Sequence, residues 1–221
     1  MRNSYQDDLA TMVEDLVAMA RLVRTAVSNG TKALLDADLQ RAEQVISEDE
    51  EIDSAQEDIE KRCFALLARQ APVAAELRTV VSALRMVSAM SRMGDLASHV
   101  AKIARMRFPE HAVPKHLQPN FERMAKLADQ MIARAADTLK TPDAAVAAEL
   151  AAIDEEMDEL RRNQFRILFD DEWEHGVEAA VDVALLGRYY ERIADHAVSL
   201  GRRVAFVVTG EHDDRETWAN V

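Results

Sequence analysis

Apolar residues recur three and four positions apart over most of the chain, a spacing that places them on one face of an α-helix. Gly and Pro, which interrupt helices, are scarce, with 6 and 5 residues. Helix-breaking and capping residues divide the pattern into six predicted helices, at about 5–28, 36–69, 72–108, 120–139, 141–174 and 177–209. The sequence therefore predicts an all-α protein.

Three of these boundaries depend on single residues. The first helix is expected to stop at Gly30, and Asp36 or Asp38 is expected to cap the second helix. The fifth is expected to begin at Thr141-Pro142, with Thr as the cap and Pro at the first helical position.

A proline cluster near the middle of the chain, at Pro109, Pro114 and Pro119, cannot lie inside one helix and predicts a linker. The linker separates two units of three helices each, and a loose polar tail follows the second unit. The predicted segments are 1–108 for the first unit, 109–119 for the linker, 120–210 for the second unit and 211–221 for the tail.

The two units resemble each other in sequence. DEEID at 49–53 recurs as DEEMD at 154–158, and RMGD at 92–95 recurs as RIAD at 192–195. Two matches in the same order, on corresponding helices, predict two tandem three-helix bundles related by a pseudo-twofold internal repeat.

The third and sixth helices are apolar on most of their faces, so both are expected to lie at the centre of the protein. Their predicted core positions are Val80, Val81, Leu84, Val87, Met90, Met93, Leu96, Val100 and Ile103 in the third, and Val181, Val183, Leu185, Leu186, Ile193 and Val198 in the sixth. The Asp that recurs in each helix is then unusual, because a charge beside a core must be paired.

Charge and composition argue against several classes of function. With a net charge of -13, the chain is poorly suited to neutralise phosphates, so no nucleic-acid partner is expected. No stretch reaches the roughly 18 to 20 apolar residues that span a bilayer. The sequence begins without an apolar signal core, and its single cysteine, Cys63, fits a reducing cytosol, so a cytoplasmic location is expected.

No Gly-rich phosphate loop or Gly-x-Ser-x-Gly elbow is present, and we expect no enzyme activity.

Carboxylates gather at four-residue spacing, which puts both members of a pair on one helix face. In the first unit Ser91 stands where the second has Glu191, and His99, one turn after Asp95, could serve as a ligand instead. The candidate metal ligands are Asp49, Asp53, Asp95 and His99 in the first unit, and Asp154, Asp158, Glu191 and Asp195 in the second.

Either a bound cation or Arg side chains must offset the repulsion within these pairs. Arg92 and Arg192 adjoin the recurrent Asp residues, so salt bridges could satisfy them without metal. No cofactor is required; if a metal binds, iron, zinc or another divalent cation is the candidate, and the second unit is the better site. A weaker alternative, a carboxylate-bridged bundle with an oxidase-like or metal-storage role, depends on one Glu-x-x-His, at 172–175, which di-iron bundles use twice.

Four segments carry a family resemblance: ELR at 76–78, LRM at 84–86, RMGDLA at 92–97 and YYERIADHA at 189–197. Together they resemble the PhoU family of phosphate-transport accessory proteins, and the resemblance covers essentially the whole chain. It implies a cytoplasmic negative regulator of the phosphate-starvation response, often a dimer. Such a protein would couple the ATPase subunit of the phosphate ABC transporter to a sensor histidine kinase, and would meet the membrane only through its partners.

The resemblance also implies that Glu/Asp-x-x-x-Asp motifs carry metal ions on the bundle surface. By position these motifs fall on 49–53, 154–158 and 191–195. Asp95 matches the family's Asp in the first unit, whereas Ser91 departs from the acidic residue common there, which puts the first metal site in more doubt than the second.

Overall fold

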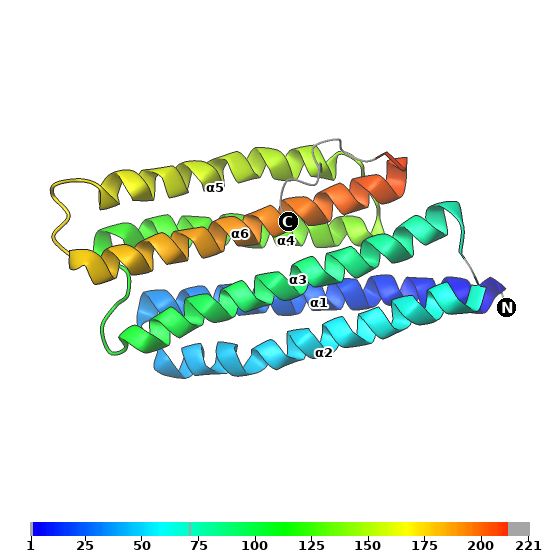
Figure 1. Cartoon of the computed structure of the whole chain (residues 1–221), viewed down its shortest axis with the longest axis horizontal. Helices are drawn as coiled ribbons and strands as arrows, with labels where there is room; N and C mark the ends of the chain where they lie inside the picture. The colour runs from blue at the N-terminus through cyan, green and yellow to red at the C-terminus, as the bar shows by residue number, and fades with distance from the viewer. Residues whose placement is uncertain (1, 71, 212–221) are drawn as a thin grey trace.

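Helices make up nearly all of the part of the chain that the computed structural model describes, residues 2–70 and 72–211. Six long helices run along the longest dimension of the molecule (Figure 1), and the described residues include no strand. They are α1 (Arg2–Asp36), α2 (Leu39–Gln70), α3 (Ala74–Arg107), α4 (Gln118–Lys140), α5 (Val146–Leu168) and α6 (Gly176–Thr209), with a short 3-10 helix, η1 (Lys115–Leu117), before α4. The predicted all-α fold is confirmed.

The helices form two bundles of three, α1 to α3 and α4 to α6, that lie side by side (Figure 1). Helices α1 and α4 pack across the junction, as do α3 and α6, which run antiparallel. The two bundles therefore share one continuous core. None of the described helices is both long enough and apolar enough to cross a membrane.

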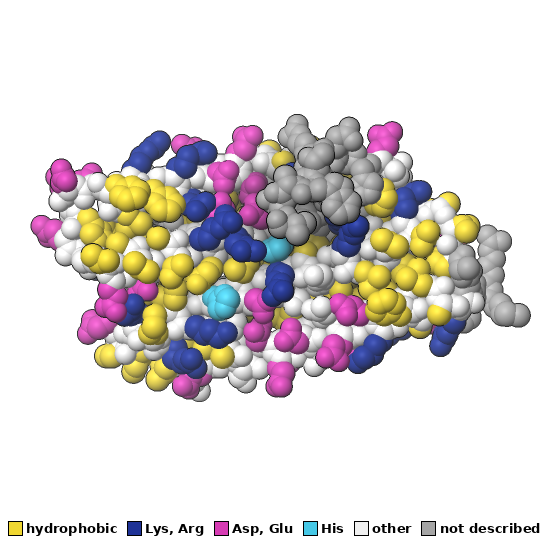
Figure 2. Space-filling view, viewed as in Figure 1, with side chains coloured by type: hydrophobic (Ala, Val, Ile, Leu, Met, Phe, Trp, Pro, Cys, Tyr) yellow, Lys and Arg dark blue, Asp and Glu magenta, His cyan; other side chains and the backbone are white. Residues whose placement is uncertain are grey.

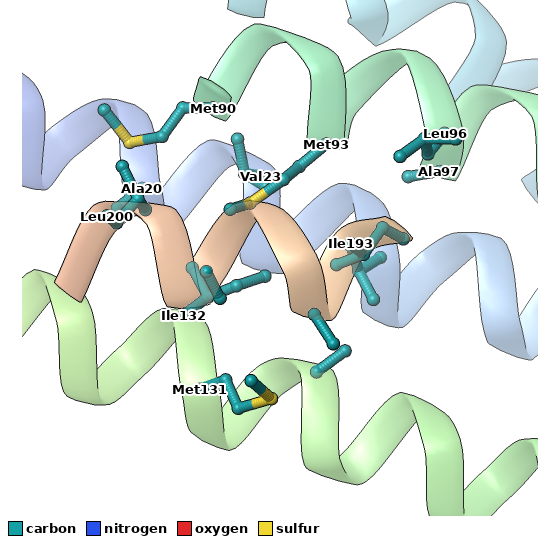
Figure 3. Close-up of a cluster of buried hydrophobic side chains, with 14 of the residues drawn as sticks. Ala20, Val23, Met90, Met93, Leu96, Ala97, Met131, Ile132, Ile193 and Leu200 are labelled. Carbon is teal, nitrogen blue, oxygen red and sulfur yellow. The ribbon is translucent and has the colours of Figure 1, made fainter. Parts of the chain in front are cut away.

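The core lies between the two bundles and draws side chains from both. Figure 3 shows Met93 of α3 and Ile193 of α6, which are equivalent positions of the repeat, in the same buried cluster as Val23 of α1 and Ile132 of α4. The predicted central position of α3 and α6 is confirmed. Three of the predicted core residues, Val81, Val181 and Leu185, are instead exposed to solvent.

The predicted end of the first helix at Gly30 is wrong, because α1 continues to Asp36. A Cβ atom on Gly30 would lie 3.0 Å from the carbonyl oxygen of Ala97 in α3, so this glycine permits close packing of two helices. Asp38 then caps α2, since its Oδ1 accepts the backbone N–H of Arg41 at 3.0 Å.

Both predicted ends of the fifth helix are wrong, since α5 begins at Val146 and ends at Leu168. Aspartate side chains bond to the backbone near each end and favour turns over helix there. Asp143 Oδ1 accepts the N–H of Ala145 at 2.9 Å, and Asp170 Oδ1 accepts the N–H of Glu172 at 3.0 Å. Residues 169–175 therefore form a loop before α6.

The predicted proline-rich linker contributes side chains to the core. Ala112, Val113 and Leu117, in and next to the proline-rich segment between the bundles, are buried in the core. Most of the predicted tail, from residue 212 onward, lies outside the described residues.

Candidate functional site

The first carboxylate cluster lies where α2 crosses α3. Asp49 of α2 lies beside Asp95 of α3, and burial, followed by the charges of Asp95 and Asp53, raises the pKa of Asp49. A Cβ atom on Gly94 would lie 3.3 Å from Asp49 Oδ1, so the glycine brings this carboxylate close to the backbone of α3. Arg92 donates to Asp95 at 2.8 Å, which partly neutralises the cluster.

The second cluster lies at the equivalent place between α5 and α6. Burial, followed by the charges of Asp195, Asp158 and Glu191, raises the pKa of Asp154 to about 6. Burial and Glu191 also raise the pKa of Asp195. Asp154 Oδ1 is buried without a hydrogen-bond partner. The structure therefore brings three of the predicted residues of the second unit near the fourth, Asp154, whose carboxylate is held unfavourably as an anion.

Arginines satisfy part of the second cluster. Glu191 is buried, accepts a hydrogen bond from Arg161 of α5 at 2.5 Å and forms an ion pair with Arg188 of α6 at 2.8 Å. The salt-bridge explanation thus holds for Glu191, and the bond from Arg92 supports it for Asp95. The bond from Arg161 is an interhelical contact that the sequence analysis missed, because no local spacing relates residues 161 and 191.

The positions of these side chains do not form a ready-made metal site. Over residues 2–70 and 72–211, no three His, Cys, Asp or Glu side chains converge closely enough to hold one ion. His99 is exposed, and its ring packs against Tyr189 of α6 with 5.4 Å between the ring centroids. Metal binding by the two clusters stays a prediction.

The Glu-x-x-His element is not presented on a helix. Glu172 and His175 lie in the loop between α5 and α6, where His175 stacks on His116 with ring centroids 5.3 Å apart. Trp173 packs edge-on against His175, with 5.0 Å between ring centroids. These side chains tie the loop to the segment that joins the two bundles.

Polar contacts between the bundles fix their relative position. Arg107 of α3 donates to Asp182 of α6 through Nε at 2.5 Å and Nη2 at 3.2 Å, and also bonds Glu178. Tyr190 of α6 shares a buried hydrogen bond of 2.7 Å with Thr31 of α1. None of these pairs could be predicted from local spacing, because each joins residues at least 71 positions apart.

Comparison with known proteins finds relatives over nearly the whole chain. The model of the PhoU domain matches twice, at residues 16–104 and 121–204, once in each bundle. The phosphate-specific transport system accessory protein PhoU homolog 1 of Mycobacterium leprae is 46% identical over 217 residues, 98% of each chain. The corresponding PhoU homolog 2 of Mycobacterium tuberculosis is 48% identical over 210 residues, 95% of this chain and 99% of its own.

The fold agrees with solved structures of such proteins. The crystal structure of PhoU from Pseudomonas aeruginosa superposes with a TM-score of 0.86 at 29% identity, covering 96% of this chain and 100% of its own. The phosphate transport system regulatory protein PhoU from Streptococcus pneumoniae gives the same TM-score at 25% identity. The two domain matches, the close relatives and the shared fold together place this chain in the PhoU family.

Proposed function

We propose that this protein is a cytoplasmic negative regulator of the phosphate-starvation response. In this proposal it contacts the ATPase subunit of the phosphate ABC transporter and a sensor histidine kinase, and it holds the kinase inactive when phosphate is plentiful. It acts by contact between proteins and transfers no chemical group.

The observation that carries the proposal is the pair of PhoU domain matches, one in each bundle, together with full-length relatives named as accessory proteins of phosphate-specific transport. The structure is compatible with a contact regulator. An ion pair and a buried hydrogen bond join the two bundles, which supports action as one unit through its outer helix faces.

A reporter gene under a phosphate-starvation promoter tests this role in a host that lacks its own PhoU proteins. In phosphate-rich medium we expect high reporter output from the empty host and output lowered several-fold when this chain is expressed. Starvation should raise output in both strains. Equal output with and without the chain in phosphate-rich medium would contradict a negative regulatory role.

We further propose that the second carboxylate cluster binds a divalent cation. The buried, unpartnered oxygen of Asp154 and the raised pKa values of Asp154 and Asp195 support this, because a cation would offset the burial and the repulsion that raise them. Binding requires Glu191 or its neighbours to move, since Glu191 is held by two arginines.

Elemental analysis of the purified protein tests the cation. We expect bound iron, zinc or manganese in the unmodified chain and a loss of that metal in a variant with Glu191→Ala and Asp195→Ala. A control with Glu155→Ala and Glu159→Ala removes two exposed acids from α5 and should keep its metal. Absence of metal from the unmodified chain, even after incubation with each ion, would contradict the proposal.

A further inference from the structure

An apolar groove opens at the end of the second bundle, beside the loop between α5 and α6. It encloses about 450 Å³ and is lined by Phe165, Leu168, Phe169, Trp173, Val177 and Val181, among others. Its side chains are unusually exposed for their type, with 83% of Phe169 and 81% of Val177 accessible to solvent. Leu185 extends this apolar stripe along α6 by one turn. Apolar side chains gather over the corresponding end of α5 and α6 in Figure 2.

The walls of the groove are held in place by contacts within the chain. The rings of Phe165 and Phe169 stack with centroids 6.0 Å apart. Trp173 Nε1 donates to the carbonyl oxygen of Gly176 at 2.8 Å, and the Trp173 ring packs against His175. A groove that is already shaped costs a partner little ordering when it binds.

The edge of the groove that the loop forms is strongly acidic. The loop carries Asp170, Asp171, Glu172 and Glu174, all of them exposed, and no Lys or Arg. Basic side chains lie on α5, where the guanidinium of Arg161 is 5.4 Å from the centroid of the Phe165 ring, at the edge of the groove away from the loop. An occupant must therefore be apolar on the face that enters the groove and positively charged where it passes the loop.

We infer that this groove docks a basic amphipathic helix from a partner protein. Such a helix presents apolar residues at i, i+3, i+4 and i+7 to an apolar groove, and its Lys and Arg residues would meet the four carboxylates of the loop. This inference rests on the proposed function, because it assigns one partner contact of the regulator to a particular surface.

The same charges disfavour two other occupants. A second copy of this chain docked groove to groove would bring two acidic loops together, and like charges that meet at an interface repel each other. An anionic membrane surface would meet the four carboxylates of the loop and be repelled. A basic helix is the occupant that both the apolar lining and the acidic rim favour.

Tryptophan fluorescence tests the docking, since Trp173 lines the groove. The other tryptophan, Trp218, is replaced by Phe so that only Trp173 reports. The probe is a synthetic helical peptide about four turns long, with Leu at i, i+3, i+4 and i+7 and Lys elsewhere. Two comparison peptides have the same composition in scrambled order, or Glu in place of every Lys.

The internal repeat offers a matched control. Val177 and Val181 correspond to Leu77 and Val81 of α3, which are also exposed but lie beside the short connection between α2 and α3. The test variant carries Val177→Ser and Val181→Ser, and the control carries Leu77→Ser and Val81→Ser. A third variant, Glu172→Lys with Glu174→Lys, reverses charge on the loop without changing the apolar lining.

We expect the Leu/Lys peptide to shift the Trp173 emission to shorter wavelength and the other two peptides to bind at least tenfold more weakly. The test variant and the charge-reversed variant should each lose at least tenfold in affinity, whereas the control should bind like the parent. Equal binding of the Lys and Glu peptides, or equal loss in the test and control variants, would overturn the inference. So would concentration-dependent dimerisation abolished by the test variant, or co-sedimentation with phosphatidylglycerol vesicles that the parent shows and the test variant lacks.

The reporter strain separates this inference from the proposed function. If the chain represses the reporter and the test variant represses it equally well, the regulatory role stands and the groove is not the partner surface. If the chain does not repress at all, the proposed function fails whatever peptide the groove binds. Repression by the control variant but not by the test variant is the result that the inference predicts.

Discussion

Replacing Arg107 by Met should lower the melting temperature by roughly 10 °C, because it leaves a buried carboxylate without its partner. The Asp182 side chain is only 4% exposed, and Arg107 supplies both of its hydrogen bonds across the junction between the bundles. Met keeps most of the apolar stem of Arg and removes the charge. Thermal unfolding followed by circular dichroism measures the change.

Two further variants isolate the cause of this loss. Arg107→Met combined with Asp182→Leu should recover much of the lost melting temperature, because replacing both partners of a buried ion pair by apolar residues is often neutral or stabilising. Arg123→Met removes an exposed pair with Glu156 and should shift the melting temperature by about 2 °C or less. An equal loss in the Arg107 and Arg123 variants would argue that the buried pair has no special role.

In protein freed of metal ions with EDTA, Asp154→Asn should stabilise the fold at neutral pH by about 1–2 kcal/mol and leave its stability unchanged near pH 4. The pKa of Asp154 is raised to about 6 in the folded protein, above its usual value near 3.8. Between these two values the folded state binds more protons than the unfolded state. The contribution of Asp154 to stability is therefore lost as the pH rises from about 4 to above 6. Solvent screening limits the size of this effect, because the carboxyl group is only half-buried.

Urea denaturation at pH 4, 5, 6 and 7.5 checks this expectation. The difference in the free energy of unfolding between variant and parent should grow through this range and level off above pH 7. Glu155→Gln, which removes an exposed acid from the same helix, should show no such growth. A constant difference at all four pH values would mean that the pKa of Asp154 is not raised in the folded protein.

The periodicity of the sequence was sufficient to predict the number and order of the helices and the central place of α3 and α6. It failed where tertiary contacts override local preference. The sequence predicts a helix end at Gly30. In the structure the absence of a side chain at Gly30 instead lets α1 pack closely against the carbonyl oxygen of Ala97 in α3. The ends of α5 were missed because Asp143 and Asp170 bond to nearby backbone, which the helical pattern does not reveal.

The sequence predicted which carboxylates gather at the candidate site, but not which of their charges are paired. Spacing identified both carboxylate clusters and left open whether Arg or metal offsets their repulsion. The structure assigns Arg161 to Glu191 and leaves Asp154 unsatisfied, a division that only three-dimensional contacts determine.

The apolar groove did have a signal in the sequence. Phe165, Phe169, Trp173, Val177, Val181 and Leu185 recur at every fourth position. The four-residue spacing continues through the acidic loop, most of which the sequence predicts as part of the fifth helix. Two of these side chains, Val181 and Leu185, are predicted from the sequence as core residues, and the structure exposes them instead.

The central claim is that the protein regulates the phosphate response by contact with other proteins, and co-purification tests it most directly. The tagged full-length chain is recovered from phosphate-rich and phosphate-starved cells that also express the transporter ATPase subunit and the sensor kinase. The account predicts that both partners are recovered with the chain, with more kinase from phosphate-rich cells. Recovery of neither partner under either condition would contradict the claim.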